Sequence, residues 1–452
     1  MTRIAIVGGG PAGYEAALVA VQLGADVTLV DRDGVGGMCV LADCVPSKTF
    51  IATSEAMTEL SQADLVGVHA EGTVTVRVAE VHARVKALAL AQSADITARL
   101  TREGVTLLPG AARLLGEGRL QVAGELLRAD VVLLATGAHP RVLPGAEPDG
   151  ERVLDWRQLY DLTALPAHLV VVGSGVTGAE FASAYLAMGC RVTLVSSRDR
   201  VLPSEDRDAA EQLQQVFERR GMHVLQGRAA GVDRSADGVV VRLTDGSLVA
   251  GSHCLMTVGS VPNTDGLGLE QAGVEVDDGG FVKVDRVSRT TGPGVYAAGD
   301  CTGVLMLASV AAMQGRIAMW HALGEAVSPL RLGTVAANVF TDPEVASVGV
   351  TQQQVDAGSV VAQSVRLPLA TNARAKMQGL TDGFVKLFCR PGSGTVLGGV
   401  VVAPRASELI LPVSLAVQHG LTADQLAHTF SIYPSLGGSI TEAARQLMLH
   451  EL

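Results

Sequence analysis

Two cysteines close together in the chain, Cys39 and Cys44, are the residues best suited to redox chemistry. In a regular helix, positions five residues apart are separated by roughly 8–9 Å at Cα, which is too far for a disulfide. The pair must therefore straddle a distorted helix start. Pro46 suits the first turn of a helix, so we expect Cys44 at a helix N-terminus, where the helix dipole lowers a thiol pKa and favours thiolate. The isolated Cys190 and Cys254 are expected in the core.

Two glycine-rich turns, Gly8–Gly13 and Gly173–Gly178, each follow an apolar run and open a helical segment. In this pattern the first glycine allows the tight turn, the second lets the backbone approach a pyrophosphate, and the third permits close helix packing. A single such turn also occurs in α/β proteins without a ligand, but its repetition after 165 residues favours two dinucleotide sites. Asp31 ends the strand after the first turn, where an acidic residue binds a ribose hydroxyl. The cofactor-binding residues predicted from these patterns are Gly8, Gly10, Gly13, Asp31, Gly173, Gly175 and Gly178.

The strand after the second turn ends differently. It closes with Ser196-Ser197-Arg198, with Arg200 nearby, in place of an acidic residue. Cationic side chains accommodate the 2′-phosphate of NADP better than a bare ribose diol. We therefore predict NADPH rather than NADH, with Arg198 and Arg200 at the phosphate. The alternative is that both arginines belong to a solvated loop.

The elements that position these residues follow from the spacing of apolar side chains. The first turn lies between a strand over Arg3–Val7 and a helix over Pro11–Leu23, which leads to a strand over Asp26–Val30. A second copy of this βαβ unit runs over His168–Val195, and such units imply buried parallel sheets. Further expected elements are a helix over Val78–Leu100, a strand over Val131–Ala135, a strand and then Gly-Asp within Gly294–Asp300, a helix over Ala308–His321, strands over Gly383–Arg390 and Gly398–Val402, and helices from Ser407 and Thr422.

Length and composition favour an α/β protein of several domains. The 452 residues exceed what one core usually organises, and 48% hydrophobic residues with 52 glycines suit sheets with many tight turns. The net charge of −11, without any Lys/Arg-rich run, argues against nucleic acid as a partner. The sequence has no apolar run near ~18 residues and no signal-peptide core, so we expect a cytoplasmic protein without an integral membrane segment. It also has no metal-ligand cluster, P-loop or Gly-x-Ser-x-Gly run.

These motifs together resemble the pyridine nucleotide-disulfide oxidoreductases over essentially the whole chain. The resemblance implies FAD and NADPH (or NADH) as cofactors, and a homodimer whose C-terminal domain completes each active site. The segments that carry it are the Cys-x4-Cys-x-Pro-Ser-Lys run, both glycine turns, Glu180, Ala135-Thr136-Gly137 and Ala298-Gly299-Asp300.

The same resemblance implies roles for individual residues. Asp300 would hold the ribityl chain, and Lys48 and Glu180 would pair near flavin N5. Cys44 would be the thiolate that faces the flavin ring, and Cys39 would attack substrate disulfides. The other residues assigned to the cofactors in this way are Thr136, Gly137, Gly299 and Ala308.

The expected fold class is α/β, with two doubly wound dinucleotide-binding (Rossmann-like) domains and a C-terminal α+β dimerisation domain. Its expected segments are the first part of the FAD-binding domain at 1–150, the NAD(P)H-binding domain at 151–269, the second part of the FAD-binding domain at 270–331 and the dimerisation domain at 332–452.

The C-terminal region departs from the family pattern. In lipoamide dehydrogenase and glutathione reductase the partner subunit supplies a His-Pro-Thr run, with a Glu five residues after the His, as the acid/base pair for dithiol exchange. This chain has Tyr433-Pro434-Ser435 there and Gly438 in place of the Glu, while His428 is expected to be a capping or surface residue. A phenol, with an ordinary pKa of ~10, transfers protons at neutral pH less readily than an imidazole of ~6.5. Loss of a general base typically costs ~10²–10⁴ in rate, so we expect neither lipoamide nor glutathione disulfide as the substrate.

Two branches of the family lack this histidine. Mercuric reductases carry a tyrosine nearby but also need adjacent cysteines at the C-terminus, and this chain ends over Leu447–Leu452 without them. The actinobacterial NAD(P)H quinone reductase branch resembles the chain nearly end to end, including Tyr433–Arg445 and Asn372–Lys376. That branch lacks one cysteine of the pair, which leaves the role of the disulfide open.

The leading hypothesis is an enzyme in which NAD(P)H reduces FAD and two electrons pass to a quinone-like acceptor by ping-pong exchange. Tyr433 of the partner subunit would hydrogen-bond the acceptor. Cys39 and Cys44 would either store electrons or take no part. One alternative is a disulfide reductase acting on an unknown disulfide. The other is a non-catalytic, redox-sensing flavoprotein.

Overall fold

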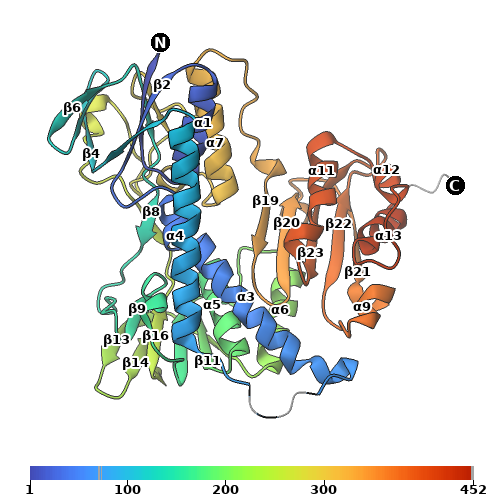
Figure 1. Cartoon of the computed structure of the whole chain (residues 1–452). Coiled ribbons are helices and arrows are strands. Elements are labelled where there is room, and N and C mark those ends of the chain that lie inside the picture. The colour runs from blue at the N-terminus through green and yellow to red at the C-terminus, as the bar shows by residue number, and fades with distance from the viewer. Residues whose placement is uncertain (70–71, 73, 449–452) are drawn as a thin grey trace. The chain divides into compact units, whose positions relative to one another are not determined.

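The computed structural model describes residues 1–69, 72 and 74–448, and Figure 1 labels many of its elements. The chain forms two compact units. The first comprises Met1–Thr49, His82–Arg141 and Gly259–Arg331, and the second comprises Phe50–Val81, Val142–Val258 and Leu332–Leu452. The four segment boundaries expected from the sequence stay predictions.

The first unit is built on a five-stranded parallel sheet in the order β18-β7-β1-β2-β3. In β1 (Arg3–Val7) all residues but the first are buried, as in a strand covered on both faces. Helices α1 (Pro11–Gln22) and α7 (Ala308–Ala322) pack closely, because a Cβ at Gly315 would lie 2.2 Å from Ala12 O. The other strands are β2 (Asp26–Asp31), β3 (Thr106–Pro109), β7 (Val131–Leu134) and β18 (Val295–Ala297).

Smaller elements complete the first unit. Helix α4 (Val78–Arg102) begins in the second unit and continues into the first. A two-stranded antiparallel ribbon joins β8 (Ala138–Pro140) to β17 (Ser260–Pro262). An antiparallel meander, β4 (Ala112–Gly116), β5 (Arg119–Val122) and β6 (Glu125–Arg128), was not predicted from the sequence.

The second unit repeats the parallel arrangement in the order β12-β11-β10-β16-β9. Helix α5 (Val176–Ala187) follows β10, and helix α6 (Arg207–Arg219) follows β11. The strands are β9 (Val153–Asp155), β10 (His168–Val172), β11 (Arg191–Ser196), β12 (His223–Gln226) and β16 (His253–Met256). A separate antiparallel sheet of β13 (Ala229–Arg234), β14 (Val239–Leu243) and β15 (Leu248–Gly251) was also not predicted.

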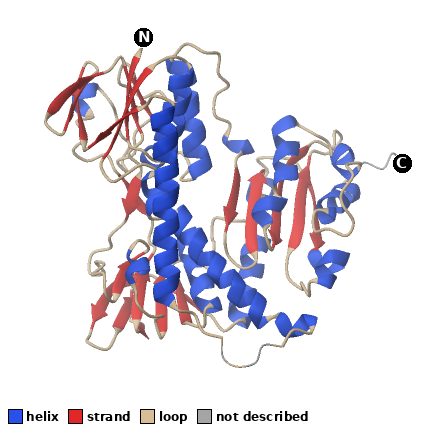
Figure 2. Ribbon diagram, in the orientation of Figure 1, coloured by secondary structure: helices blue, strands red, loops and turns tan. Residues whose placement is uncertain are grey.

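The C-terminal part of the second unit is an antiparallel sheet in the order β19-β20-β23-β22-β21, which Figure 2 shows with helices packed beside it. Strand β22 (Phe384–Cys389), which lies between β23 and β21, is buried throughout. The other strands are β19 (Ala336–Val339), β20 (Glu344–Gly349), β21 (Gln363–Pro368) and β23 (Val396–Ala403). The helices are α8 (Gln352–Asp356), α9 (Ala373–Met377), α10 (Ala406–Leu409), α11 (Leu411–His419), α12 (Ala423–Ala427) and α13 (Gly438–Gln446).

The predicted fold class is confirmed. Each of the two parallel sheets has a glycine turn after one of its strands, and an antiparallel sheet with helices follows them in the chain. The strand over Arg3–Val7 has the predicted bounds, and α7 extends one residue beyond the predicted helix. Cys190 and Cys254 are buried core residues, as predicted.

Candidate active site

The cysteine pair lies across a break between two helices. Cys39 is in α2 (Gly37–Leu41), and Cys44 is the first residue of α3 (Cys44–Ser61), with Pro46 in the first turn. The predicted distorted helix start is therefore confirmed. Gly36 N donates a hydrogen bond to Gly9 O at 2.8 Å, which fixes the start of α2 against the first glycine turn. Both thiols are free and partly exposed, so they can react.

The two thiols share a hydrogen bond that separates their acidities. The hydrogen bond from Cys44 lowers the pKa of Cys39, and Lys48 adds a smaller lowering. The same hydrogen bond and then burial raise the pKa of Cys44. Because the two thiols share one proton in this bond, the titration belongs to the pair. The expected thiolate at Cys44 stays a prediction.

The first glycine turn has the geometry of a pyrophosphate cradle. Gly8 has φ +109, and a Cβ there would lie 2.2 Å from Ala135 O; a Cβ at Gly13 would lie 1.8 Å from Gly8 O. At Gly10 a Cβ would meet nothing within 4 Å, so the chain leaves space beside this residue at the N-cap of α1. An anion can approach the helix N-terminus through that space. These residues fit the diphosphate of a dinucleotide.

The carboxylate of Asp31 closes the first turn from the end of β2. Its Oδ2 accepts a hydrogen bond from Gly9 N at 2.5 Å, and its Oδ1 accepts from Asp33 N at 2.8 Å and Gly34 N at 2.6 Å. A carboxylate has about four acceptor positions, so about one is left for a ligand hydroxyl. The predicted ribose contact of Asp31 fits this geometry and stays a prediction.

Thr136 and Gly137 lie beside the β8–β17 ribbon, where hydrogen bonds converge on Asn263. Thr136 Oγ1 donates to Asn263 O, and Asn263 Nδ2 donates to Thr136 O, both at 2.8 Å. Asn263 N donates to Gly137 O at 3.0 Å, and His139 Nδ1 lies 2.7 Å from Asn263 Oδ1. Neither Asn263 nor His139 was predicted from the sequence. The side chain and the carbonyl group of Thr136 are thus both used to hold the turn.

The turn at Gly299-Asp300 is fixed by a residue of α7. Gly299 has φ +83, and its N–H donates to Oε1 of the buried Gln314 at 2.9 Å. Burial raises the pKa of Asp300, as expected for a carboxyl removed from water. Ala308 begins α7. Gln314 was not predicted, although a glutamine within a helix of small apolar residues is a signal for a buried hydrogen-bonding role.

The second glycine turn repeats the first. A Cβ at Gly178 would lie 1.9 Å from Gly173 O, and at Gly175 a Cβ would meet nothing within 4 Å. Thr257 braces this turn, since its Oγ1 lies 2.9 Å from Val172 O and 3.0 Å from Gly173 O. The same cradle for a diphosphate is therefore present in the second unit, on different residues.

The end of β11 differs from the end of β2, as the sequence indicated. Ser196 Oγ lies 2.7 Å from Ser174 Oγ, 3.2 Å from Arg198 N and 3.0 Å from Arg200 O. Arg198 is exposed, and Nη1 of Arg200 lies 3.2 Å from Oδ2 of Asp199. The Nε of Arg200 is buried without a hydrogen-bond partner in the part of the chain that the structure describes. A guanidinium with a spare donor beside a glycine turn fits an anionic ligand.

Lys48 and Glu180 belong to different units, so their pairing stays a prediction. Glu180 is buried in α5, and its Oε1 accepts a hydrogen bond from Phe340 N at 2.9 Å. This contact joins α5 to the chain after β19 within the second unit. Lys48 contributes positive charge beside both thiols.

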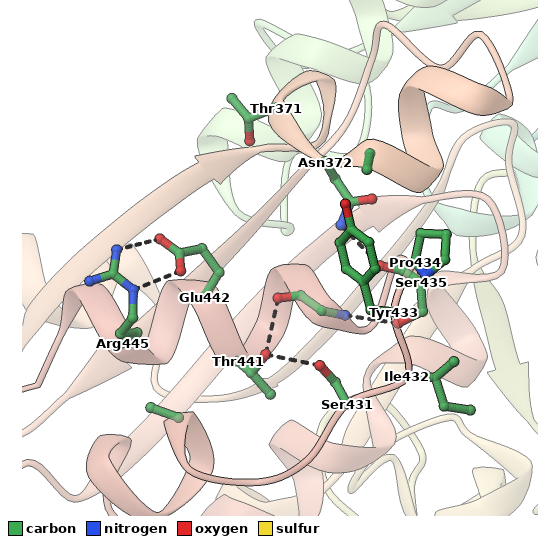
Figure 3. Close-up of a pocket in the computed structure, with 13 residues that line it drawn as sticks. Thr371, Asn372, Ser431, Ile432, Tyr433, Pro434, Ser435, Thr441, Glu442 and Arg445 are labelled. Carbon is green, nitrogen blue, oxygen red and sulfur yellow. Dashed lines mark hydrogen bonds and ion pairs between the residues drawn. The ribbon is translucent and has the colours of Figure 1, made fainter.

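Tyr433 lines a cavity of about 380 Å³ in the C-terminal part of the second unit (Figure 3). It is 84% exposed, and its cis-linked Pro434 follows. Asn372 orders this wall, because its Nδ2 donates to Ser435 O at 3.0 Å and to Ser439 Oγ at 2.8 Å. The cavity is also lined by Thr371, Ile432, Gly438, Thr441, Glu442 and Arg445.

The predicted position of His428 is confirmed, because it is the C-cap of α12 and its Nδ1 bonds the carbonyl of Asp424 at 2.9 Å. Within the described residues no group of three or more His, Cys, Asp and Glu could hold a metal ion. In the same residues no helix is long and apolar enough to span a bilayer. Residues 449–452, the place of the cysteine pair of mercuric reductases, lie outside the described residues.

Two nucleotide cradles, a thiol pair and a C-terminal α+β domain define a flavin-dependent oxidoreductase of the pyridine nucleotide type. The chain belongs to the pyridine nucleotide-disulphide oxidoreductase family, which matches residues 2–315, and the dimerisation domain of that family matches residues 335–444. Enzymes of this family use FAD and NAD(P)H.

Among the relatives, an NAD(P)H dehydrogenase (quinone) of Mycobacterium tuberculosis is 58% identical over 467 residues, covering 100% of this chain and 95% of the relative. A dihydrolipoyl dehydrogenase of Chlorobaculum tepidum is 35% identical, covering 98% of this chain and 96% of the relative. The crystal structure of LpdA from M. tuberculosis has a TM-score of 0.95 at 59% identity, covering 99% of this chain and 100% of that chain. The HOCl-induced flavoprotein disulfide reductase RclA of Escherichia coli has a TM-score of 0.88 at 25% identity, covering 98% of this chain and 99% of that chain.

Proposed function

We propose that this enzyme takes a hydride from NADPH and delivers two electrons to a quinone-type acceptor. The observation that carries the proposal is Tyr433, an exposed phenol at a cavity wall where thiol-exchanging members of the family place an imidazole. A quinone that accepts a hydride can take its proton from water, so it does not need that imidazole. The M. tuberculosis relative at 58% identity is named for the same reaction.

The residues of the chain have separate tasks in this reaction. FAD, when bound, accepts the hydride from the nicotinamide and passes two electrons on to the acceptor. The turns at Gly8–Gly13 and Gly173–Gly178 bind the two diphosphates through backbone N–H groups at helix starts. Asp300 and Lys48 would hold the flavin, and Glu180 would pair with Lys48. Tyr433 of the partner subunit donates a hydrogen bond to an acceptor oxygen.

The homodimer is part of this proposal. The loop before α13 exposes Phe430 at 104%, Ile432 at 82% and Tyr433 at 84%, which is costly for apolar and aromatic side chains in water. A second copy would cover them and receive Tyr433. Sedimentation equilibrium should give a dimer, and a monomer at micromolar concentration that retains full activity would contradict this arrangement. We also propose that 1–150 and 270–331 make up the FAD-binding domain, 151–269 the NADPH-binding domain and 332–452 the dimerisation domain.

The nucleotide preference rests on Arg198 and Arg200. Steady-state kcat/KM with NADPH and with NADH tests it, and we expect NADPH to be preferred in the wild type. Arg198→Met with Arg200→Met should reduce kcat/KM for NADPH at least tenfold and leave NADH within twofold. A wild-type preference for NADH would overturn the assignment of the phosphate to this loop.

The acceptor is tested by anaerobic reduction of the holoenzyme with NADPH, followed by menadione or lipoamide. We expect fast reoxidation of the flavin by menadione and lipoamide turnover lower by ~10²-fold or more. The double variant Cys39→Ser with Cys44→Ser should keep its menadione turnover. Efficient lipoamide reduction by the wild type would overturn the quinone proposal.

A disulfide reductase is the second candidate, because the chain keeps two neighbouring thiols that share a hydrogen bond. The flavoprotein disulfide reductase RclA of Escherichia coli, at 25% identity, has the same fold. In this case the substrate disulfide would have to supply its own proton donor. A screen of disulfides that finds turnover abolished in the Cys39→Ser variant would favour this candidate over the quinone reductase.

A further inference from the structure

Lys386 is a lysine in the middle of a buried strand. It lies in β22, in the run Phe384–Cys389, and its side chain is only 4% exposed. Its neighbour on the same face of the strand, Phe388, is also buried, with its ring centroid 5.4 Å from the Lys386 ammonium. A lysine is rarely placed in such surroundings unless it is paired. The charge therefore has a specific partner.

The partners of Lys386 are two carboxylates at the start of α6. Its Nζ lies 3.0 Å from Asp206 Oδ2 and 2.8 Å from Asp208 Oδ2. Asp206 is also buried, with 3% of its side chain exposed, and it is the N-cap of α6. Its Oδ1 accepts hydrogen bonds from Asp208 N at 3.0 Å and Ala209 N at 3.3 Å. Asp206 thus uses one oxygen to cap the helix and the other to bind the C-terminal sheet.

Helix α6 in turn holds the loop that carries the two arginines. Val201 N donates to Oε1 of Gln214, which lies in α6, at 3.2 Å. The loop is also tied to the second glycine turn, because Leu202 N donates to Ser174 O at 2.9 Å. The path from Lys386 to Arg200 therefore runs through the first turn of α6, Gln214 and Val201. Every step of it lies within the second unit.

Other links between α6 and the C-terminal part of the chain are more exposed, among them a hydrogen bond from Arg366 Nη2 to Gln212 Oε1 at 3.3 Å. Arg219 pairs with Asp382 at 2.6 Å, with side chains 54% and 33% exposed, and Arg220 pairs with Asp342 at 2.9 Å, with both 31% exposed. Exposed ion pairs hold geometry poorly, because water competes for both charges. The buried contact of Lys386 lies at the first turn of the helix, where Ser347 Oγ of β20 also lies 3.5 Å from Glu205 Oε2.

We infer that Lys386 is a positioning residue for the binding of the nicotinamide nucleotide. Lys386 fixes the start of α6 and thereby the loop that presents Arg198 and Arg200. The dimerisation domain would then set the affinity for the nucleotide phosphate, although Lys386 itself does not touch the nucleotide. This inference rests on the proposed binding of a 2′-phosphate by that loop.

The test uses the FAD-loaded holoenzyme and two ligands, 2′,5′-ADP and 5′-AMP, measured by isothermal titration calorimetry. Lys386→Met leaves Asp206 buried and unpaired, so that variant can lose its fold. The variant that decides is the neutral triple Lys386→Met, Asp206→Asn and Asp208→Asn, because asparagine also caps helices well. We expect the triple variant to bind 2′,5′-ADP at least tenfold more weakly and 5′-AMP within twofold of wild type. Asp382→Asn removes the ion pair with Arg219 at the C-terminal end of α6, so it serves as the matched control and should change neither affinity.

A second measurement separates this inference from the proposed function. Hydrogen exchange of the amides over residues 197–206 should be faster in the triple variant than in the wild type, with exchange in the core of α5 unchanged. Wild-type protein that binds both ligands equally would refute the 2′-phosphate proposal. The exchange data would still show whether Lys386 fixes the loop. A folded triple variant with wild-type loop exchange and wild-type affinity for 2′,5′-ADP would overturn the role of Lys386.

Discussion

Replacing Gly178 with alanine should abolish use of the nicotinamide nucleotide while the protein keeps its flavin. A Cβ at this position would lie 1.9 Å from Gly173 O and 2.7 Å from Thr257 Oγ1. Ordinary contacts of a Cβ begin near 3.4 Å, so the start of α5 must move from the glycine turn by the difference of about 1.5 Å. Gly173 O is a backbone atom, and Thr257 Oγ1 is held by hydrogen bonds to the turn, so neither atom can move away from the new Cβ by itself.

The size of the effect follows from that displacement. A misplacement of about 1 Å can cost ~10² in rate, and each tenfold corresponds to about 1.36 kcal/mol. We therefore expect kcat/KM for NADPH to fall at least ~10²-fold, or about 2.7 kcal/mol in transition-state binding. Overpacking of this kind also costs about 1–3 kcal/mol of folding stability, so the melting temperature should fall.

Gly175→Ala is the matched control in the same turn. Gly175 has φ −72, and a Cβ there would meet nothing within 4 Å, so alanine is compatible with the fold. Its methyl group would instead occupy the space through which a diphosphate approaches the backbone. This variant should keep the wild-type melting temperature and still bind NADPH more weakly.

The assay combines three readings on each variant: flavin absorbance after purification, the melting temperature and the anaerobic rate of flavin reduction by NADPH. A Gly178→Ala protein that is reduced at the wild-type rate would refute the close-packing reasoning. Loss of flavin from the same variant would show that the two nucleotide sites do not form independently.

Three further predictions concern acid–base behaviour. The reduced protein should react with iodoacetamide at Cys39 at pH values below the ordinary thiol pKa of ~8.5. Cys44→Ala should remove this reactivity at low pH. Cys44→Ser keeps a hydrogen-bond donor and should preserve most of the reactivity. Tyr433→His combined with Gly438→Glu should restore the acid/base pair and raise lipoamide turnover at least tenfold. The side chain at position 438 has room, because a Cβ there would meet nothing nearer than 3.8 Å. Unchanged turnover would mean that the missing acid/base pair does not limit lipoamide reduction. Burial raises the pKa of Glu205 above its unfolded value. The neutral carboxyl group therefore contributes to folding stability at low pH, and this contribution is lost as pH rises through the folded pKa. Glu205→Gln should raise the melting temperature relative to wild type more at pH 8 than at pH 4.

The parallel sheets could be predicted because their signals are local. In β1 and the following glycine turn, apolar runs, glycine spacing and a helix start lie within 20 residues of one another, so each confirms its neighbours. The meanders β4–β6 and β13–β15 have no comparable signal. Their strands are only four to six residues long, and some of them, such as β13, do not alternate buried and exposed residues.

The long-range contacts at the site could not be predicted from one sequence. Asn263 bonds Thr136 across 127 positions of the chain, and Lys386 bonds Asp206 across 180. Nothing in the local pattern of either partner names the other. A lysine inside the apolar run of β22 does signal a buried pair, but it does not say which carboxylate completes it. The hydrogen bond between the two thiols likewise joins two helices, and the position of Cys44 at a helix start does not predict it.

The two glycine turns differ mainly in what stands at the end of the strand that follows. Asp31 gives the first turn a negative charge, and that carboxylate is bound by three backbone N–H groups, so a phosphate on the ribose would meet a fixed anion there. Ser196 occupies the corresponding place in the second turn, and its hydroxyl leaves the site without that charge. Because the steric frames of the turns are nearly the same, the choice of ligand is electrostatic. The first turn suits a ribose diol, and the second, with Arg198 and Arg200 beside it, suits a phosphorylated ribose.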